Sequence, residues 1–231
     1  KTDLFHNMGS MPSAIPDRYL LVNEQESAGS CINYLIDNLL YPADGLGAVE
    51  RPVDVYDRLN VVAAAVPAGS DNLIFLPWLY GERSPIDDST VRGGFFNQSL
   101  QTTRAHMVRA VFEGVAYNTR WLLQYVEKFI KRPLQSIRVI GGGAQSDLWC
   151  RIMADVLDRP MLQIDNPLQV NTRGAAFIAA VALGYLSFAD VNSRVKSPKP
   201  IIQTLKIGRS MTSFSANLTI YTKTIVVVLR G

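Results

Sequence analysis

An α/β fold is predicted for this chain, because short apolar segments suited to β-strands alternate with longer segments of helical periodicity. The clearest unit is residues 137–164, where an apolar segment leads through the glycine run 141–143 into an amphipathic segment and then into a second apolar segment. The chain has 231 residues, of which 48% are hydrophobic and 19% charged, so it can bury one substantial core with appended segments.

The first half of the chain is expected to contain two strands and two helices. Hydrophobic spacing predicts a strand over residues 19–23 and a helix over 27–40. A stretch punctuated by proline and glycine follows, and then a strand over 73–77. The next element is a long helix over 103–131, with Met107, Val111 and Val115 on its apolar stripe. His106 falls in the first turn of that helix.

The second half alternates strand and helix. Strands are predicted over residues 137–140 and 161–164, and helices over 147–157 and 172–183. Ser146 is suited to cap the start of the first helix, and Gly184 to end the second. The apolar run 174–186 is too short to span a bilayer and is interpreted as a buried helix, so no membrane partner is expected.

Composition argues against several classes of function. A net charge of +3, with basic residues scattered among acidic ones, does not favour a nucleic-acid partner. His6 and His106 are the only histidines, so neither a histidine metal site nor Ser-His-Asp chemistry is expected. Cys31 and Cys150 stand alone, which favours a reducing cytoplasmic setting. No signal-peptide pattern opens the chain, so secretion is not indicated.

The glycine run before residue 147 is the strongest single pointer to a ligand. Glycine lets the main chain approach a planar or phosphorylated group, and the free N–H groups that open the next helix favour oxygen-rich ligands. The spacing fits neither the dinucleotide fingerprint nor the P-loop. A ligand-free strand-to-helix turn explains the same glycines equally well, so both readings stay open.

Two further segments carry a resemblance. Residues 73–95 contain a Pro-Trp-Leu strand end, the loop 81–85 of sequence Gly-Glu-Arg-Ser-Pro, and the pair Arg92 and Gly93; residues 109–114 read Arg-Ala-Val-Phe-Glu-Gly. In kind, order and spacing, these segments and the glycine run resemble the FGGY carbohydrate kinases, most closely the pentulose kinases of xylulokinase type. Asn97 and Gln98 depart from the family pattern, which expects a glycine and an aliphatic residue there.

The resemblance covers about residues 19–195 and implies the C-terminal lobe of a two-lobed kinase with the actin-like, ribonuclease H-like ATPase fold. It implies three regions: residues 1–18 as a remnant of the preceding hairpin, 19–200 as the nucleotide-binding domain, and 201–231 as an atypical tail. The tail departs from the family after Pro200, and a frameshift in the gene or its sequencing is one hypothesis for it. The first β-hairpin and the catalytic aspartate of the preceding lobe are not found in the chain, so no catalytic residue is assigned.

The resemblance also implies what the lobe does. This lobe would hold ATP together with Mg²⁺. The N-terminal kinase domain of the same protein would supply the sugar contacts and the catalytic base. The γ-phosphoryl group would pass to a hydroxyl of a pentulose, with D-xylulose as the first candidate. Alone, the chain is expected to be inactive and at best marginally folded. Without the strands of the missing hairpin, the neighbouring strand edges of the sheet would be unpaired, and each unsatisfied backbone group costs about 1–3 kcal/mol. The residues expected at the nucleotide are Gly29, Asn33, Gly142, Gly143, Ala144 and Asp147.

Other readings stay open. Gly29 could serve helix packing alone and Asn33 could be a solvated side chain, while Glu82 and Arg83 are expected to be structural. Trp78, Trp121 and Trp149 are expected to be packing residues. The alternative function is a non-catalytic, nucleotide-binding or regulatory fragment of an actin-like ATPase. A homodimer is also compatible with the sequence.

Overall fold

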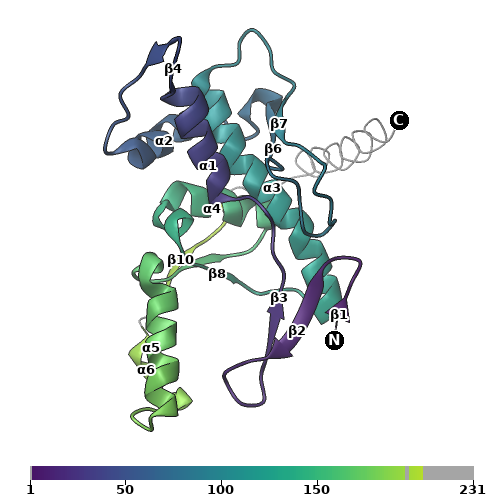
Figure 1. The fold of residues 1–231 in the computed structure, drawn as a ribbon, viewed down its shortest axis with the longest axis vertical. Coiled ribbons are helices and arrows are strands. Elements are labelled where there is room, and N and C mark those ends of the chain that lie inside the picture. The colour runs from purple at the N-terminus through teal and green to yellow at the C-terminus, as the bar shows by residue number, and fades with distance from the viewer. Residues whose placement is uncertain (1, 196–197, 205–231) are drawn as a thin grey trace.

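The computed structural model describes residues 2–195 and 198–204, and it is organised around one long helix, α3 (Arg104–Ile130). In Figure 1, α3 runs through the middle of the molecule with α1, α2 and α4 on its flanks. The buried face of α3 includes Val108, Val111 and Val115, which confirms the predicted apolar stripe. A capping box between Thr103 and His106 opens the helix, so His106 does occupy its first turn.

The first 22 residues form more structure than predicted. Strands β1 (Thr2–Asp3), β2 (Met8–Pro12) and β3 (Tyr19–Val22) make an antiparallel sheet in the order β1-β2-β3. Residues 8–22 are thus a β-hairpin, which crosses the boundary predicted after residue 18. The segment 8–12 has too few apolar residues for a strand to be predicted there. Its conformation comes from pairing with β3, for example Met11 opposite Leu20.

Helix α1 (Gly29–Leu35) continues as a π-turn, η1 (Ile36–Leu40), which confirms the predicted helix over 27–40. A small hairpin of β4 (Ala43–Asp44) and β5 (Gly47–Ala48) leads to helix α2 (Val55–Ala64). The sequence had assigned no helix to this proline- and glycine-punctuated stretch. Val55, Leu59 and Ala63 recur every four residues and are buried against the core around α3.

After a 3-10 turn, η2 (Ser70–Asn72), strand β6 (Ile74–Leu76) confirms the strand predicted over 73–77, and it pairs with β7 (Gly94–Phe96). This pair packs on α3 at a glycine. A Cβ atom on Gly114 would collide with the carbonyl oxygen of Phe75, so the helix can approach the strand only where residue 114 has no side chain. Gly93 is in a similar position, because a Cβ there would collide with the carbonyl oxygen of Leu76.

The C-terminal part is a βαβ unit with one added strand. Strand β8 (Ile137–Val139), the turn η3 (Gly142–Gln145), helix α4 (Asp147–Leu157) and β9 (Met161–Gln163) follow in order, and β8 and β9 are parallel. Strand β10 (Lys199–Ile201) adds to β9 in the antiparallel sense. The predicted α/β class and the elements over 137–164 are therefore confirmed.

The predicted boundary after residue 200 falls inside β10. Ile201 is buried against Cys150 and Met161, and Thr204 donates its backbone N–H to the carboxylate of Asp155. The described part of the tail thus packs on the domain, because Ile201 belongs to β10 and has a buried side chain. The frameshift hypothesis and the apolar segment 224–229 concern residues outside those that the structure describes.

Helix α5 (Val170–Ala182) follows the 3-10 turn η4 (Pro167–Gln169) and precedes α6 (Phe188–Arg194). The sequence predicted a buried helix here, and this prediction is wrong for the structure described. All thirteen residues of α5 are described and none is buried, and Ile178 is 48% exposed. In Figure 1, α5 and α6 extend away from α3. The apolar composition predicted the helix, but it does not show whether another element packs against that helix. Among the described residues, no helix is long and apolar enough to cross a membrane.

Candidate functional site

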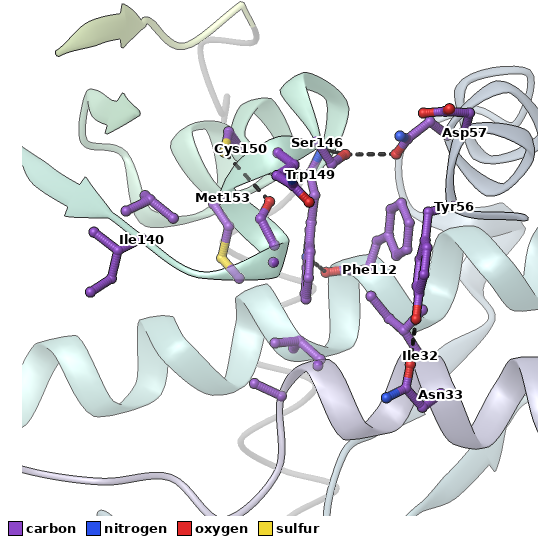
Figure 2. Close-up of a pocket in the computed structure, with 18 of the residues that line it drawn as sticks. Ile32, Asn33, Tyr56, Asp57, Phe112, Ile140, Ser146, Trp149, Cys150 and Met153 are labelled. Carbon is purple, nitrogen blue, oxygen red and sulfur yellow. Dashed lines mark hydrogen bonds between the residues drawn. The ribbon is translucent and has the colours of Figure 1, made fainter. Parts of the chain in front are cut away.

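The candidate site is a cavity of about 840 Å³ between α1, α2, α3 and the glycine turn that precedes α4. In Figure 2, Trp149 and Phe112 lie between Ile140 and Met153 on the left and Tyr56 and Asn33 on the right. The residues lining it are Ala28, Gly29, Ile32, Asn33, Val53, Asp54, Tyr56, Asp57, Asn60, Phe112, Val115, Thr119, Val139, Ile140, Gly142, Gly143, Gln145, Ser146, Trp149, Cys150 and Met153. The volume is in the range of pockets that bind small molecules and cofactors.

The wall formed by α4 depends on a capped helix start and an aromatic stack. Ser146 accepts the backbone N–H of Trp149 at 2.9 Å, which is the predicted N-cap. The Trp149 ring stacks on Phe112 with 5.4 Å between centroids, and its Nε1–H donates to the Phe112 carbonyl at 3.1 Å. Trp149 is therefore a packing residue, as predicted, and it also forms part of the cavity wall.

The glycine turn has two distinct reasons for its composition. Gly141 has a φ of +82°, a backbone conformation that favours glycine. Gly143 lies against Trp149, and a Cβ there would come within 2.7 Å of the ring atom Cζ3. Nothing lies within 4 Å of a Cβ built on Gly142, so this residue presents open main chain to the cavity.

The structure brings together four of the six residues expected at a nucleotide. Gly29 and Asn33 from α1 lie in the same cavity as Gly142 and Gly143, although more than 100 positions separate the two pairs in the sequence. Ala144, in contrast, is 3% exposed and does not line the cavity.

Asp147, which was also expected at the nucleotide, is not among the residues that line the cavity. Its carboxylate accepts from Lys199 Nζ at 2.6 Å and from Gln163 Nε2 at 3.0 Å, which places it toward the sheet formed by β9 and β10. The hydrogen bond from Lys199, and then that from Gln163, holds the pKa of this carboxyl below its usual value. The partner that redirects Asp147 comes from β10, a strand that the sequence did not predict.

Helix α2 supplies polar groups that the sequence reasoning missed. Tyr56 Oη donates to Asn33 Oδ1 at 2.9 Å, and Ser146 Oγ lies 2.6 Å from Asn60 Oδ1. Asp57, on the same helix, faces the cavity rim (Figure 2). The four-residue spacing of Val55, Leu59 and Ala63 was the available signal for this helix.

The electrostatics of the cavity favour an uncharged, flat ligand group. Its lining includes the carboxylates of Asp54 and Asp57 but no lysine or arginine. Arg58 pairs with Asp54 at 2.8 Å and lowers the pKa of that carboxyl. Among the described residues, no group of three or more His, Cys, Asp or Glu side chains converges as a metal site. Apolar walls with polar edges suit a nucleobase and its sugar better than a phosphate group.

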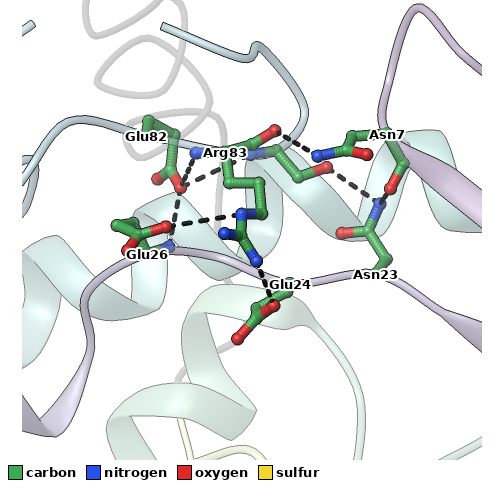
Figure 3. A network of polar contacts seen from close by, with 7 residues as sticks. Asn7, Asn23, Glu24, Glu26, Glu82 and Arg83 are labelled. Atoms are coloured by element: carbon green, nitrogen blue, oxygen red, sulfur yellow. Dashed lines mark hydrogen bonds and ion pairs between the residues drawn. The ribbon is translucent and has the colours of Figure 1, made fainter. Parts of the chain in front are cut away.

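A second polar cluster lies apart from the cavity and organises the loop 81–85 (Figure 3). Glu82 is 5% exposed and accepts from the Nδ2 of Asn118 at 2.6 Å and from the backbone N–H of Glu26 at 3.0 Å. Arg83 pairs with Glu24 and Glu26, at 2.6 Å and 3.5 Å. Both residues therefore have structural contacts, as expected, with partners in the segment that leads into α1.

Comparisons with known proteins agree with these features. The family model for the C-terminal domain of the FGGY family of carbohydrate kinases matches residues 4–183. A gluconokinase from Bacillus subtilis is 28% identical over 209 residues, which cover 89% of this chain and 40% of that protein. A xylulose kinase from Staphylococcus epidermidis is 28% identical over 191 residues, covering 83% and 36%.

The crystal structure of a xylulose kinase from Rhodospirillum rubrum aligns with a TM-score of 0.80 and 29% identity, covering all of this chain and 44% of that one. The chain thus spans less than half the length of these relatives. The fold expected from the loop at 81–85 and the helix at 109–114, actin-like and ribonuclease H-like, is confirmed. The chain therefore belongs to the FGGY family of carbohydrate kinases and corresponds to its C-terminal domain.

Proposed function

We propose that this domain holds the adenosine part of ATP for an ATP-dependent carbohydrate kinase. One observation supports this most: the fold gathers Gly29, Asn33, Gly142 and Gly143 around a single cavity with apolar walls. These are four of the residues that the family resemblance selects at the nucleotide. Gly142 leaves room for a ring to lie on the main chain, and Ile32 and Met153 provide apolar contact.

The charges suggest how the nucleotide would lie. With two aspartates and no cation in the lining, the cavity suits the base and ribose, and the triphosphate would extend out of it. The described residues offer no cluster for Mg²⁺, so this ion enters the proposal only as the companion of ATP, and no step is assigned to it here.

The proposed reaction is in-line transfer of the γ-phosphoryl group to a sugar hydroxyl. Positioning and charge stabilisation dominate catalysis of such transfers, and this domain would contribute the positioning of the donor. The base that accepts the hydroxyl proton is not assigned to this chain. D-Xylulose is the first candidate acceptor, since two of the three relatives above are xylulose kinases. D-Gluconate is the second, because a gluconokinase aligns with 89% of the chain.

The test is calorimetric titration of ATP into the protein expressed from its complete reading frame, followed by assays of ADP release with D-xylulose and with D-gluconate. A Gly29→Leu variant would place a side chain in the cavity, and its Cβ would meet no clash, because nothing lies within 4 Å of a Cβ at that position. We expect it to weaken ATP binding about 10-fold or more, since a misfit at a ligand contact costs about 1–3 kcal/mol.

Gly45→Leu is the matched control, because Gly45 is exposed, has equally open space and lies outside the cavity lining. Its ATP affinity should equal that of the unmodified protein. Absence of ATP binding by the unmodified protein, or equal affinity in both variants, would contradict the proposed function.

A further inference from the structure

Asn60 on α2 and Ser146 before α4 meet across the candidate site, with Oδ1 and Oγ 2.6 Å apart. The direction of this hydrogen bond can be worked out. A hydroxyl has one proton to donate, and an amide oxygen can only accept. Ser146 Oγ already accepts the backbone N–H of Trp149 at 2.9 Å, so its own proton is directed to Asn60 Oδ1. The carboxamide of Asn60 is therefore oriented with its oxygen on Ser146 and its NH₂ group turned away from it.

A second amide of the lining is oriented in the same way. Tyr56 Oη donates to Asn33 Oδ1 at 2.9 Å, which leaves the Asn33 NH₂ group for another partner. Neither Nδ2 atom, of Asn60 or of Asn33, has a hydrogen-bond acceptor among the residues that the structure describes. Asn33 is exposed, whereas Asn60 is half-buried and therefore less hydrated. An unpaired N–H costs more in the less hydrated position, so Asn60 has the greater need of a ligand acceptor.

The chemistry of the ligand atom follows from what else the lining offers. Ribose hydroxyls both donate and accept hydrogen bonds, and the carboxylates of Asp54 and Asp57 can accept hydrogen bonds from them. The ring nitrogens N1, N3 and N7 of adenosine only accept, so they need a donor from the protein. Asn60 is such a donor, and Ser146, which orients it, also holds the α4 wall that carries the Trp149 ring.

We propose that Asn60 recognises the base at this site by donating an N–H from Nδ2 to a ring nitrogen of adenine, with Ser146 as the residue that orients it. The inference rests on the proposed function and deepens it by naming a base contact on α2, outside the glycine turn and α1. A site with a pre-oriented donor discriminates against a base lacking the matching acceptor, because the donor is then left unpaired.

An Asn60→Asp substitution separates the ligand contact from the structural one. Aspartate is close in shape and still accepts the Ser146 proton, so the link between α2 and α4 and the thermal midpoint are expected to be preserved. The NH₂ donor is replaced by an acceptor, so affinity for both ATP and adenosine should fall about 10-fold or more. Asn38→Asp is the control: it makes the same charge change on an exposed side chain outside the lining, and it should leave both affinities within about twofold.

The experiment is calorimetry on the complete protein with ATP, adenosine, and the 1-, 3- and 7-deaza analogues of adenosine. Adenosine has no phosphates, so a loss confined to ATP would indicate repulsion of phosphate by the new carboxylate and would overturn the proposal. Unchanged adenosine affinity in the Asn60→Asp variant would overturn it as well.

The analogues need no variant. One of them should bind the unmodified protein as weakly as adenosine binds the Asn60→Asp variant, and that analogue identifies the accepting nitrogen. If all three bind like adenosine, the base contact is refuted. Failure of the unmodified protein to bind either ATP or adenosine is a different outcome, because it refutes the proposed function itself.

Discussion

Replacing Glu82 by glutamine should destabilise the fold far more than its surface-loop position in the sequence suggests. The Glu82 side chain is 5% exposed, and its carboxylate lies between the loop 81–85, the segment before α1, and α3 (Figure 3). Oε1 accepts the backbone N–H groups of Glu26 and Arg83 at 3.0 Å and 2.9 Å, and Oε2 accepts from Asn118 Nδ2 at 2.6 Å. Glutamine can keep only one of the two accepting oxygens.

The size of the effect follows from Asn118. In the Glu82→Gln variant, an NH₂ group would face the NH₂ group of Asn118. Asn118 cannot simply rotate its amide, because its Oδ1 accepts the Nε1–H of Trp78 at 3.2 Å. One buried donor is therefore left unpaired, at a cost of about 1–3 kcal/mol. The backbone donors also lose a charged acceptor, which adds about 1 kcal/mol. We expect the free energy of unfolding to fall by about 2–4 kcal/mol.

Urea denaturation of the complete protein, followed by tryptophan fluorescence, measures this change. Glu24→Gln is the control, because Glu24 pairs with Arg83 at a side chain that is 65% exposed, and its loss should cost within about 0.5 kcal/mol. The double variant Glu82→Gln with Asn118→Asp should regain most of the stability, since an aspartate at 118 can accept from both Trp78 and the new amide. An unchanged denaturation midpoint in Glu82→Gln, or a double variant no better than the sum of the single ones, would refute the reasoning.

Two other outcomes are expected. Leu35→Ala should lower the free energy of unfolding by about 2–5 kcal/mol because Leu35 is 0% exposed, whereas Leu168→Ala at a 62% exposed position should change it by less than about 0.5 kcal/mol; similar denaturation midpoints for the two variants would contradict the assigned core. Cys31 and Cys150 should react with Ellman's reagent at pH 8 only after denaturation, because burial raises the pKa of both thiols, that of Cys31 to about 12; rapid release of two equivalents of thiolate from the native protein would contradict this.

Most elements with strong local signals were predictable. The helix α3 has an apolar stripe along its 27 residues, and the unit from β8 to β9 has the strand, glycine turn, cap and amphipathic helix in order. Elements were missed where the local signal is weak and the conformation depends on pairing with a strand that is distant in the sequence or weakly predicted. β2 contains Gly9, Ser10 and Pro12 and becomes a strand by pairing with β3, while β10 is a strand because β9 offers it an edge.

The candidate site was predictable in part for the same reason. Gly29 and Asn33 belong to one short sequence segment, and Gly142 and Gly143 to another. Both segments could be recognised from the sequence, and the fold brings them into one cavity. The pairing of Asp147 with Lys199 could not be predicted from the sequence, because Lys199 lies 52 positions later on an unpredicted strand. Asn60 could not be included, because its significance comes from Ser146, which is 86 positions distant.

By itself, the sequence determined the α/β class, the long central helix, the glycine turn with its serine cap, and the kinase family, since each depends on the spacing of residues within a short segment. Tertiary structure alone decided which side chains face the cavity, that Glu82 is a buried acceptor for three segments, and that the apolar helix α5 has no covering partner among the described residues. The physical reason is that burial and hydrogen-bond partnership belong to pairs of groups, and those pairs are formed by the folding of distant segments against one another.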